Sequence, residues 1–336
     1  MLKSVISDHK QLISRLARLG ISVGLLIYVF LTVDLRNLFL SIIDVDLWLL
    51  GVGILLVWLS WSAMAARWHI LLWALGWQLR LVDTWIITQT SQFYSLFLPG
   101  QVGGEISRWA KVVTQVKQSG TDVAVSIVMD RLVGLSAQIL IGSLALVLYK
   151  GSTLNLTVKL IVWGLALGNL VLWIGILIGL DRALPAPVQN LLAQLADRIG
   201  LLERTLTAIK SYQGKSTTIG ASTIVAMIGH GLSALNKVVI AAALHLSIPP
   251  LELVLVYIVV SILVMIPVTI SGMGLREASY IGLLNEFGHT GDSVTAIPLI
   301  SFALVVFSAL TLGGTLELIG SAQHLLSSGS STSKKH

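Results

Sequence analysis

Phe97-Leu98-Pro99-Gly100-Gln101-Val102-Gly103-Gly104-Glu105-Ile106-Ser107-Arg108 interrupts an apolar run in the first half of the chain. Residues 265–277 read Met-Ile-Pro-Val-Thr-Ile-Ser-Gly-Met-Gly-Leu-Arg-Glu and interrupt a second apolar run in the same manner. In both segments a proline is followed by glycines and then by an Arg and a Glu that open a helix. Proline and glycine end helices, so both segments predict broken helices. The helix-break residues are Pro99, Gly103, Gly104, Pro267, Gly272 and Gly274.

The composition around these breaks is that of a membrane protein. Of 336 residues, 55% are hydrophobic and 11% are charged, whereas soluble domains carry about 25% charged residues. The apolar runs are continuous rather than alternating, which favours helices over a β-barrel. The net charge of +6 lies in loops between these runs, so it indicates topology and anionic headgroups rather than nucleic acid. The chain has no cysteine, which excludes disulfides and thiol chemistry.

The sequence predicts an all-α polytopic protein with six full spans and two re-entrant, broken segments. We expect a single membrane domain over 1–326, with halves of about 1–150 and 151–326 and a disordered tail over 327–336. A periodic apolar pattern predicts an amphipathic helix on the membrane surface within the cytoplasmic loop 181–216. The expected spans are about 19–33, 47–66 (closed by Arg67), 122–149, 160–180, 218–246 and 294–320.

The distribution of basic residues predicts the orientation. If 84–118 and 251–288 re-enter without crossing, the segments on the side of the N-terminus hold 16 Lys and Arg, and the opposite loops hold three. Cytoplasmic loops are enriched in these residues. Both termini are therefore expected in the cytoplasm.

The two breaks also predict an inverted repeat. Pro99 and Pro267 are separated by half the length of the chain, and an odd number of crossings per half inverts the second half. Paired Pro/Gly-interrupted segments are the usual sequence pointer to a transporter's binding site. The alternative is that each break is an ordinary kink or turn.

Charged residues at membrane depth are costly and commonly functional. The substrate-binding candidates are Glu105, Arg108, Asp130, Arg131, Arg276 and Glu277. Adjacent helical residues point about 100° apart, so Asp130 and Arg131 are expected to reach separate partners, Arg108 and Glu105 respectively. The alternatives are a structural ion pair for the middle two and ordinary helix caps for the others.

His230 and Lys237 are weaker candidates. His230 suits a hydrogen-bonded packing position, and Lys237 can extend its ammonium group toward the outer surface. We find no metal cluster, nucleophile motif or phosphate-binding loop in the sequence. The sequence therefore predicts neither an enzyme nor a bound cofactor or metal.

Taken together, these motifs resemble the lysylphosphatidylglycerol synthase transmembrane family, the flippase-like domain also found in the multiple peptide resistance factor. The resemblance spans roughly residues 15–325 and includes Asp130-Arg131-Leu-Val-Gly-Leu. This chain has Asp130 at a position where Glu is expected as often in the family, which is a conservative departure. The chain resembles the membrane part without the aminoacyltransferase domain, so the resemblance implies movement of a phospholipid or lipid-linked headgroup between leaflets and not lysyl transfer. Because members of the family occur in bacteria and archaea, the resemblance also implies the plasma membrane.

The resulting hypothesis is a flippase whose two hairpins meet near the midplane. Arg108, Arg131 and Arg276 would bind a phosphate, and the neighbouring acids would orient them or receive an amine. Two alternatives remain open: a secondary transporter of a small polar or anionic solute, and a non-transporting scaffold for a lipid or glycan enzyme. A homodimer is also left open.

Overall fold

A computed structural model describes most of the chain, including all but the first of the expected spans. The described residues are 43–97, 103–116, 118–150, 156–178, 186–187, 190, 194–195, 200–265, 269, 272, 274–290 and 292–320. The expected first span at 19–33, the tail at 327–336, and Pro99 and Pro267 lie outside this set.

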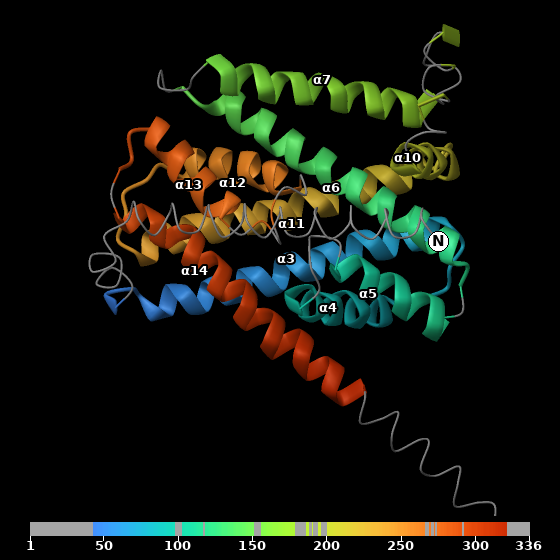
Figure 1. The fold of residues 1–336 in the computed structure, drawn as a ribbon, viewed down its shortest axis with the longest axis horizontal. Helices are drawn as coiled ribbons and strands as arrows, with labels where there is room; N and C mark the ends of the chain where they lie inside the picture. The colour runs from blue at the N-terminus through green and yellow to red at the C-terminus, as the bar shows by residue number, and fades with distance from the viewer. Residues whose placement is uncertain are drawn as a thin grey trace, which may run out of the picture.

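Four long helices form the frame of the molecule (Figure 1). They are α3 (Leu47–Ala74), α6 (Gly120–Leu148), α11 (Ser216–Ala243) and α14 (Asp292–Ser308), which continues through the π-helical turn η2 (Ala309–Gly314) to Gly320. Each is long and apolar enough to cross a bilayer, which takes about 20 residues. The part of the chain that the structure describes contains helices and no strands. The chain is thus an all-helical, multi-pass membrane protein, as predicted.

Helices α3 and α11 form an antiparallel pair at the centre of the bundle. The amide of Asp46 donates to the carbonyl of Ala243 at one end, over 3.0 Å. Near the other end, the Ser222 hydroxyl donates to the carbonyl of Arg67. A Cβ added to Gly229 would lie 3.4 Å from a backbone oxygen of α3. Small residues thus let the two backbones approach closely, as is common between membrane helices.

Two helical hairpins pack against this frame at opposite ends of the bundle (Figure 1). The first consists of α4 (Leu81–Phe97) and α5 (Gly103–Lys111), and η1 (Val112–Val116) leads from it to α6. The second consists of α12 (Pro250–Met265) and α13 (Leu275–Glu286) and leads to α14. In each hairpin the helix ends where the sequence places the Pro/Gly interruption.

The two hairpins occupy equivalent places in the order of elements. Helix α11 follows α3 by half the length of the chain, and α12 follows α4 by the same interval. The pairs α5 and α13, and α6 and α14, are separated by nearly the same interval. These intervals match the separation of the two prolines, so the same order of long helix, hairpin and long helix occurs twice.

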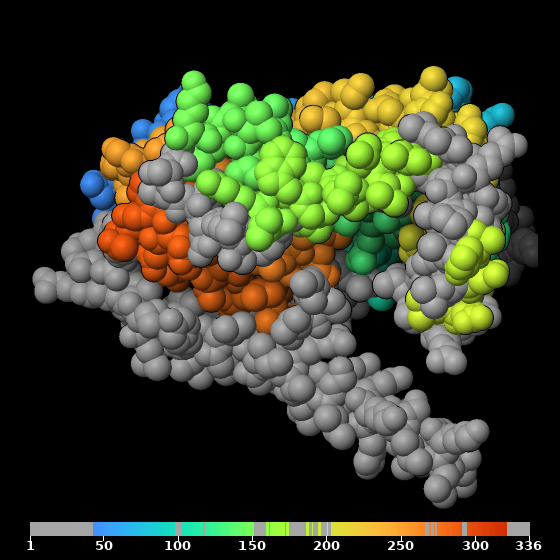
Figure 2. Space-filling view, turned by 90° about the horizontal axis from the view of Figure 1, so that it is seen from above, coloured from blue at the N-terminus to red at the C-terminus, as the bar shows by residue number. Residues whose placement is uncertain are grey.

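Two further helices lie beside α6. Helix α7 (Leu156–Ile178) occupies the expected fourth span and forms the outer layer of the face in Figure 2. Helix α10 (Gly200–Ser211) lies where the amphipathic surface helix was expected. Its buried residues Ala208 and Ile209 pack against α6 and α3, and the expected position on the membrane surface stays a prediction. Tyr212 follows them and donates to the carbonyl of Leu71 over 3.0 Å. Burial raises the pKa of Tyr212, which keeps this donor protonated.

The prediction for the second span was wrong at its end. Helix α3 continues to Ala74, so Arg67 lies inside the helix and is 6% exposed. Trp68, which lies beyond the expected end of the span, is fully buried. A charged side chain inside an apolar helix ended the predicted span, because the sequence did not reveal the partner that neutralises it.

Candidate functional site

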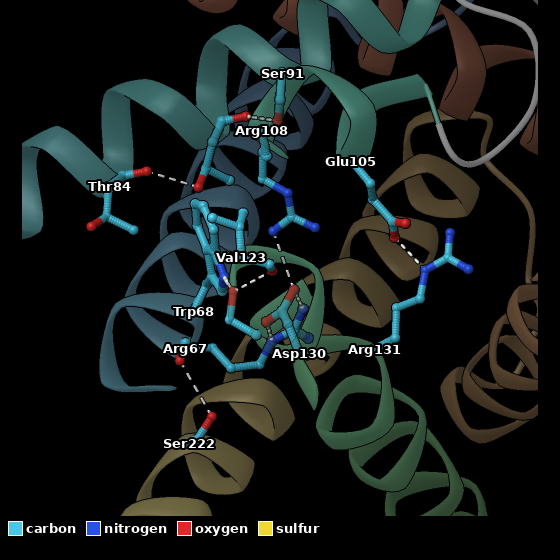
Figure 3. Close-up of polar contacts among 12 residues, drawn as sticks. Arg67, Trp68, Thr84, Ser91, Glu105, Arg108, Val123, Asp130, Arg131 and Ser222 are labelled. Atoms are coloured by element: carbon cyan, nitrogen blue, oxygen red, sulfur yellow. Dashed lines mark hydrogen bonds and ion pairs between the residues drawn. The ribbon is translucent and has the colours of Figure 1, made fainter. Parts of the chain in front are cut away.

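Asp130 of α6 lies at the centre of a buried ionic cluster with two arginines (Figure 3). Arg67 of α3 donates from Nε to Oδ1 over 2.6 Å and from Nη2 to Oδ2 over 2.9 Å. Arg108 of α5 donates from Nη1 to Oδ2 over 3.2 Å. Asp130 is 1% exposed. Two guanidinium groups therefore share one carboxylate, which leaves the cluster with one net positive charge.

Small and aromatic neighbours shape the space around these arginines. A Cβ at Gly134, one turn beyond Asp130, would lie 2.7 Å from Nη1 of Arg67, so a larger residue there would force that guanidinium to shift. The guanidinium of Arg108 lies 4.9 Å from the ring centre of Trp68. The indole of Trp68 in turn donates to the Ser126 hydroxyl. The cation–π contact and the ion pair together fix Arg108 between α3 and α6.

Arg131 forms a second ion pair, with Glu105 in the first turn of α5. Because Arg131 and Asp130 point to different sides of α6, each binds a separate partner on α5, as expected from the sequence. The Arg131 side chain is 37% exposed, whereas that of Arg108 is 11% exposed. Arg131 is therefore the more exposed of these two arginines.

In the second hairpin, Glu277 has the helix-cap role that the sequence left open as an alternative. Its Oε2 accepts the amide of Gly274 over 2.7 Å, so this carboxylate caps its own helix, α13. Gly274 and Gly272 have φ angles of 76° and 77°, a left-handed region that favours glycine. The glycines therefore make the sharp return that the sequence pattern predicted.

The six candidates do not converge on one point. Glu105, Arg108, Asp130 and Arg131 lie together in Figure 3, whereas Arg276 lies in the other hairpin, with its guanidinium 5.7 Å from the ring centre of Phe302. The reason is packing: α4 contacts α3 and η2, whereas α12 contacts α6 and α11. The hairpins thus occupy different sides of the central pair.

The two weaker candidates take part in hydrogen bonds within the bundle. His230 Nδ1 lies 3.2 Å from the hydroxyl of Tyr257 and 3.4 Å from Nε2 of Gln138. Lys237 donates to Oδ1 of its neighbour Asn236 over 3.2 Å. Among the described residues, no three His, Asp or Glu side chains cluster so as to hold a metal ion.

The sequence did not single out Arg67 as a site residue, and it missed a second ionic group entirely. Lys111, at the end of α5, pairs with Glu317 near the end of α14. The Tyr94 hydroxyl donates to Oε1 of the same carboxylate over 2.9 Å. Glu317 lies within the expected last span, and its position in an apolar run was the signal that could have identified it.

Comparison with protein families identifies a match to this chain. A family model described as "Lysylphosphatidylglycerol synthase TM region" matches residues 15–313. Nothing among curated proteins or among solved structures matches the chain.

Proposed function

Because this chain belongs to the lysylphosphatidylglycerol synthase transmembrane family, we propose that it moves a phospholipid or lipid-linked headgroup between the two leaflets of the bilayer. The observation that carries the proposal is the hairpin α4–α5, whose returning helix brings Glu105 and Arg108 to a pair of oppositely charged residues on α6. The proposal concerns lipid movement and not lysyl transfer, because the match is to the transmembrane region.

The proposed architecture is an inverted repeat with two re-entrant hairpins. The recurrence of corresponding helices half a chain apart supports it, as does the glycine return of the second hairpin. Such repeats bind substrates where helices are discontinuous, since the free backbone groups there require protein, water or ligand as partners. In this proposal both termini face the cytoplasm and the membrane is the plasma membrane.

Arg131 and Arg276 are the proposed phosphate-binding residues. Both are partly exposed, and a guanidinium matches the geometry of a phosphate. Arg108 and Arg67 hold the frame through Asp130 and keep the local potential positive. A headgroup would pass along these charged side chains while its acyl chains stay in lipid.

The double substitution Arg131→Gln/Arg276→Gln is expected to slow lipid movement about tenfold to a hundredfold. Because the two arginines lie in different parts of the bundle, the headgroup would meet them one after the other. Each step would lose one charge-assisted hydrogen bond to the phosphate, worth about 1.5–3 kcal/mol. The measurement is the rate at which reconstituted protein exposes fluorescent phospholipid to a membrane-impermeant quencher.

The matched control is Arg80→Gln. Arg80 is a loop arginine whose side chain is 80% exposed and pairs with Asp83, so lipid movement should not change. Equal rates for the double variant and the wild type, at equal thermal stability, would remove both arginines from the mechanism. Protein that moves no lipid at all in vesicles would contradict the proposed function itself.

A further inference from the structure

A cavity of about 350 Å³ lies between the first hairpin and the end of α14. Helix α4, the junction of α5 with η1, and the last turn of α14 provide its walls. It lies within the volume range of small-molecule sites, about 300–1,000 Å³. Its lining residues are Ile86, Ile87, Thr90, Lys111, Gln115, Leu316, Glu317 and Gly320.

The polar side of this cavity carries one cation and one anion. Lys111 Nζ donates to the Thr90 hydroxyl over 2.9 Å and pairs with Glu317. Glu317 also accepts a hydrogen bond from the hydroxyl of Tyr94. The centre of the Tyr94 ring lies 5.3 Å from Nζ of Lys111. The side chains of Lys111 and Glu317 are 17% and 25% exposed. The pair is thus only partly shielded, and each charge can exchange its partner for a ligand group.

The remaining sides of the cavity are apolar and border a surface that suits lipid. Ile86, Ile87 and Leu316 line it. The next residues on α14, Leu318 and Ile319, are 74% and 50% exposed. In Figure 1 this end of α14 extends away from the other helices. A headgroup in the cavity could therefore keep its acyl chains in the bilayer.

We infer that this cavity binds the headgroup of a zwitterionic phospholipid with one phosphate and one primary amine, as in phosphatidylethanolamine. This inference rests on the proposed function, because it assigns the class of lipid that is moved. The phosphate binds Lys111 and the ammonium group binds Glu317. Each protein charge therefore still has an opposite charge beside it when the Lys111–Glu317 ion pair separates.

The pairing of phosphate with Lys111 and of amine with Glu317 disfavours other headgroups. An anionic lipid without an amine would engage Lys111 and leave the Glu317 carboxylate facing a phosphate, with only Tyr94 as a partner. Leaving one member of a partly buried ion pair unpaired is unfavourable. A quaternary ammonium satisfies the charge but has no N–H donor for the carboxylate, whereas a primary ammonium has three donors. The expected order of binding is ethanolamine, then choline, then glycerol headgroups.

The test is lipid selectivity of the full chain, measured by native mass spectrometry in mixed micelles of phosphatidylethanolamine, phosphatidylcholine and phosphatidylglycerol. Wild-type protein should retain phosphatidylethanolamine about tenfold over phosphatidylglycerol. Glu317→Gln should abolish this preference. The amine of phosphatidylethanolamine then has no carboxylate to bind, and the phosphate of phosphatidylglycerol is no longer repelled by one. Glu286→Gln, at an exposed position at the end of α13, is the matched control and should retain the wild-type selectivity.

A purely structural role for the ion pair predicts a different result. In that case Glu317→Gln lowers thermal stability while lipid selectivity stays at the wild-type value, and this outcome overturns the inference. If the variant does not fold, the test uses displacement of bound lipid from wild-type protein. Phosphoethanolamine should displace the lipid at lower concentration than glycerol phosphate does. Equal potency of the two compounds contradicts the inference.

The inference and the proposed function fail in different ways. Selective binding without lipid movement in vesicles overturns the proposed function and leaves the site in place. Lipid movement with unselective binding overturns the site alone.

Discussion

Asp130→Asn is expected to destabilise the protein by about 3–5 kcal/mol, the usual cost of removing one partner from a buried ion pair. The carboxylate binds two guanidinium groups and is 1% exposed. Without it, Arg67 and Arg108 would lie close together with no anion between them. A lower midpoint of thermal unfolding in detergent, together with a lower yield of monodisperse protein, would show the effect.

Asp122→Asn provides the matched control for this substitution. Asp122 lies in the first turn of the same helix and is exposed, so its replacement should change stability by no more than about 0.5 kcal/mol. A triple variant, Arg67→Met/Arg108→Met/Asp130→Leu, should recover most of the lost stability, because apolar side chains can replace a buried ionic group. An unchanged midpoint for Asp130→Asn would contradict the role given to the cluster.

Gly313→Ala is expected to destabilise the protein by about 1–3 kcal/mol, as is typical when a tight contact is overpacked. A Cβ at this position would lie 2.5 Å from the carbonyl oxygen of Gln89 and 3.0 Å from Cβ of Phe93. These atoms belong to α4, so the π-helical part of α14 would have to move away from the first hairpin. Thermal unfolding measures the destabilisation, and loss of lipid selectivity would report the accompanying opening of the cavity beside Lys111.

The control for this prediction is Gly231→Ala in α11, where a Cβ meets no atom within 4 Å. Alanine is the better helix former by about 1 kcal/mol, so this variant should be as stable as the wild type or slightly more stable. If Gly313→Ala unfolds at the same midpoint as Gly231→Ala, then α14 does not depend on close contact with α4.

Local patterns in the sequence were sufficient for most of the fold. Apolar run lengths placed α6 and α11 to within a few residues, and the Pro/Gly segments marked both hairpins. The angular step between helical neighbours assigned Arg108 to Asp130 and Glu105 to Arg131. Each of these features depends on residues near one another in the chain or on the regular geometry of one helix.

The features that the sequence misassigned depend on contacts between distant segments. Arg67 looked like the end of a span because its partner, Asp130, lies 63 residues away. Lys111 and Glu317 are separated by 206 residues, and no local pattern connects them.

By itself, then, the sequence determined that this chain is an all-helical membrane protein with two helix breaks half a chain apart. Hydrocarbon requires long apolar helices, and Pro and Gly interrupt them wherever they occur, so these properties follow from local composition. Only the tertiary structure decided that Arg67 pairs with Asp130 and that Lys111 pairs with Glu317. A buried charge needs an opposite charge within a few ångströms, and only the packing of α3, α5, α6 and α14 brings those side chains together.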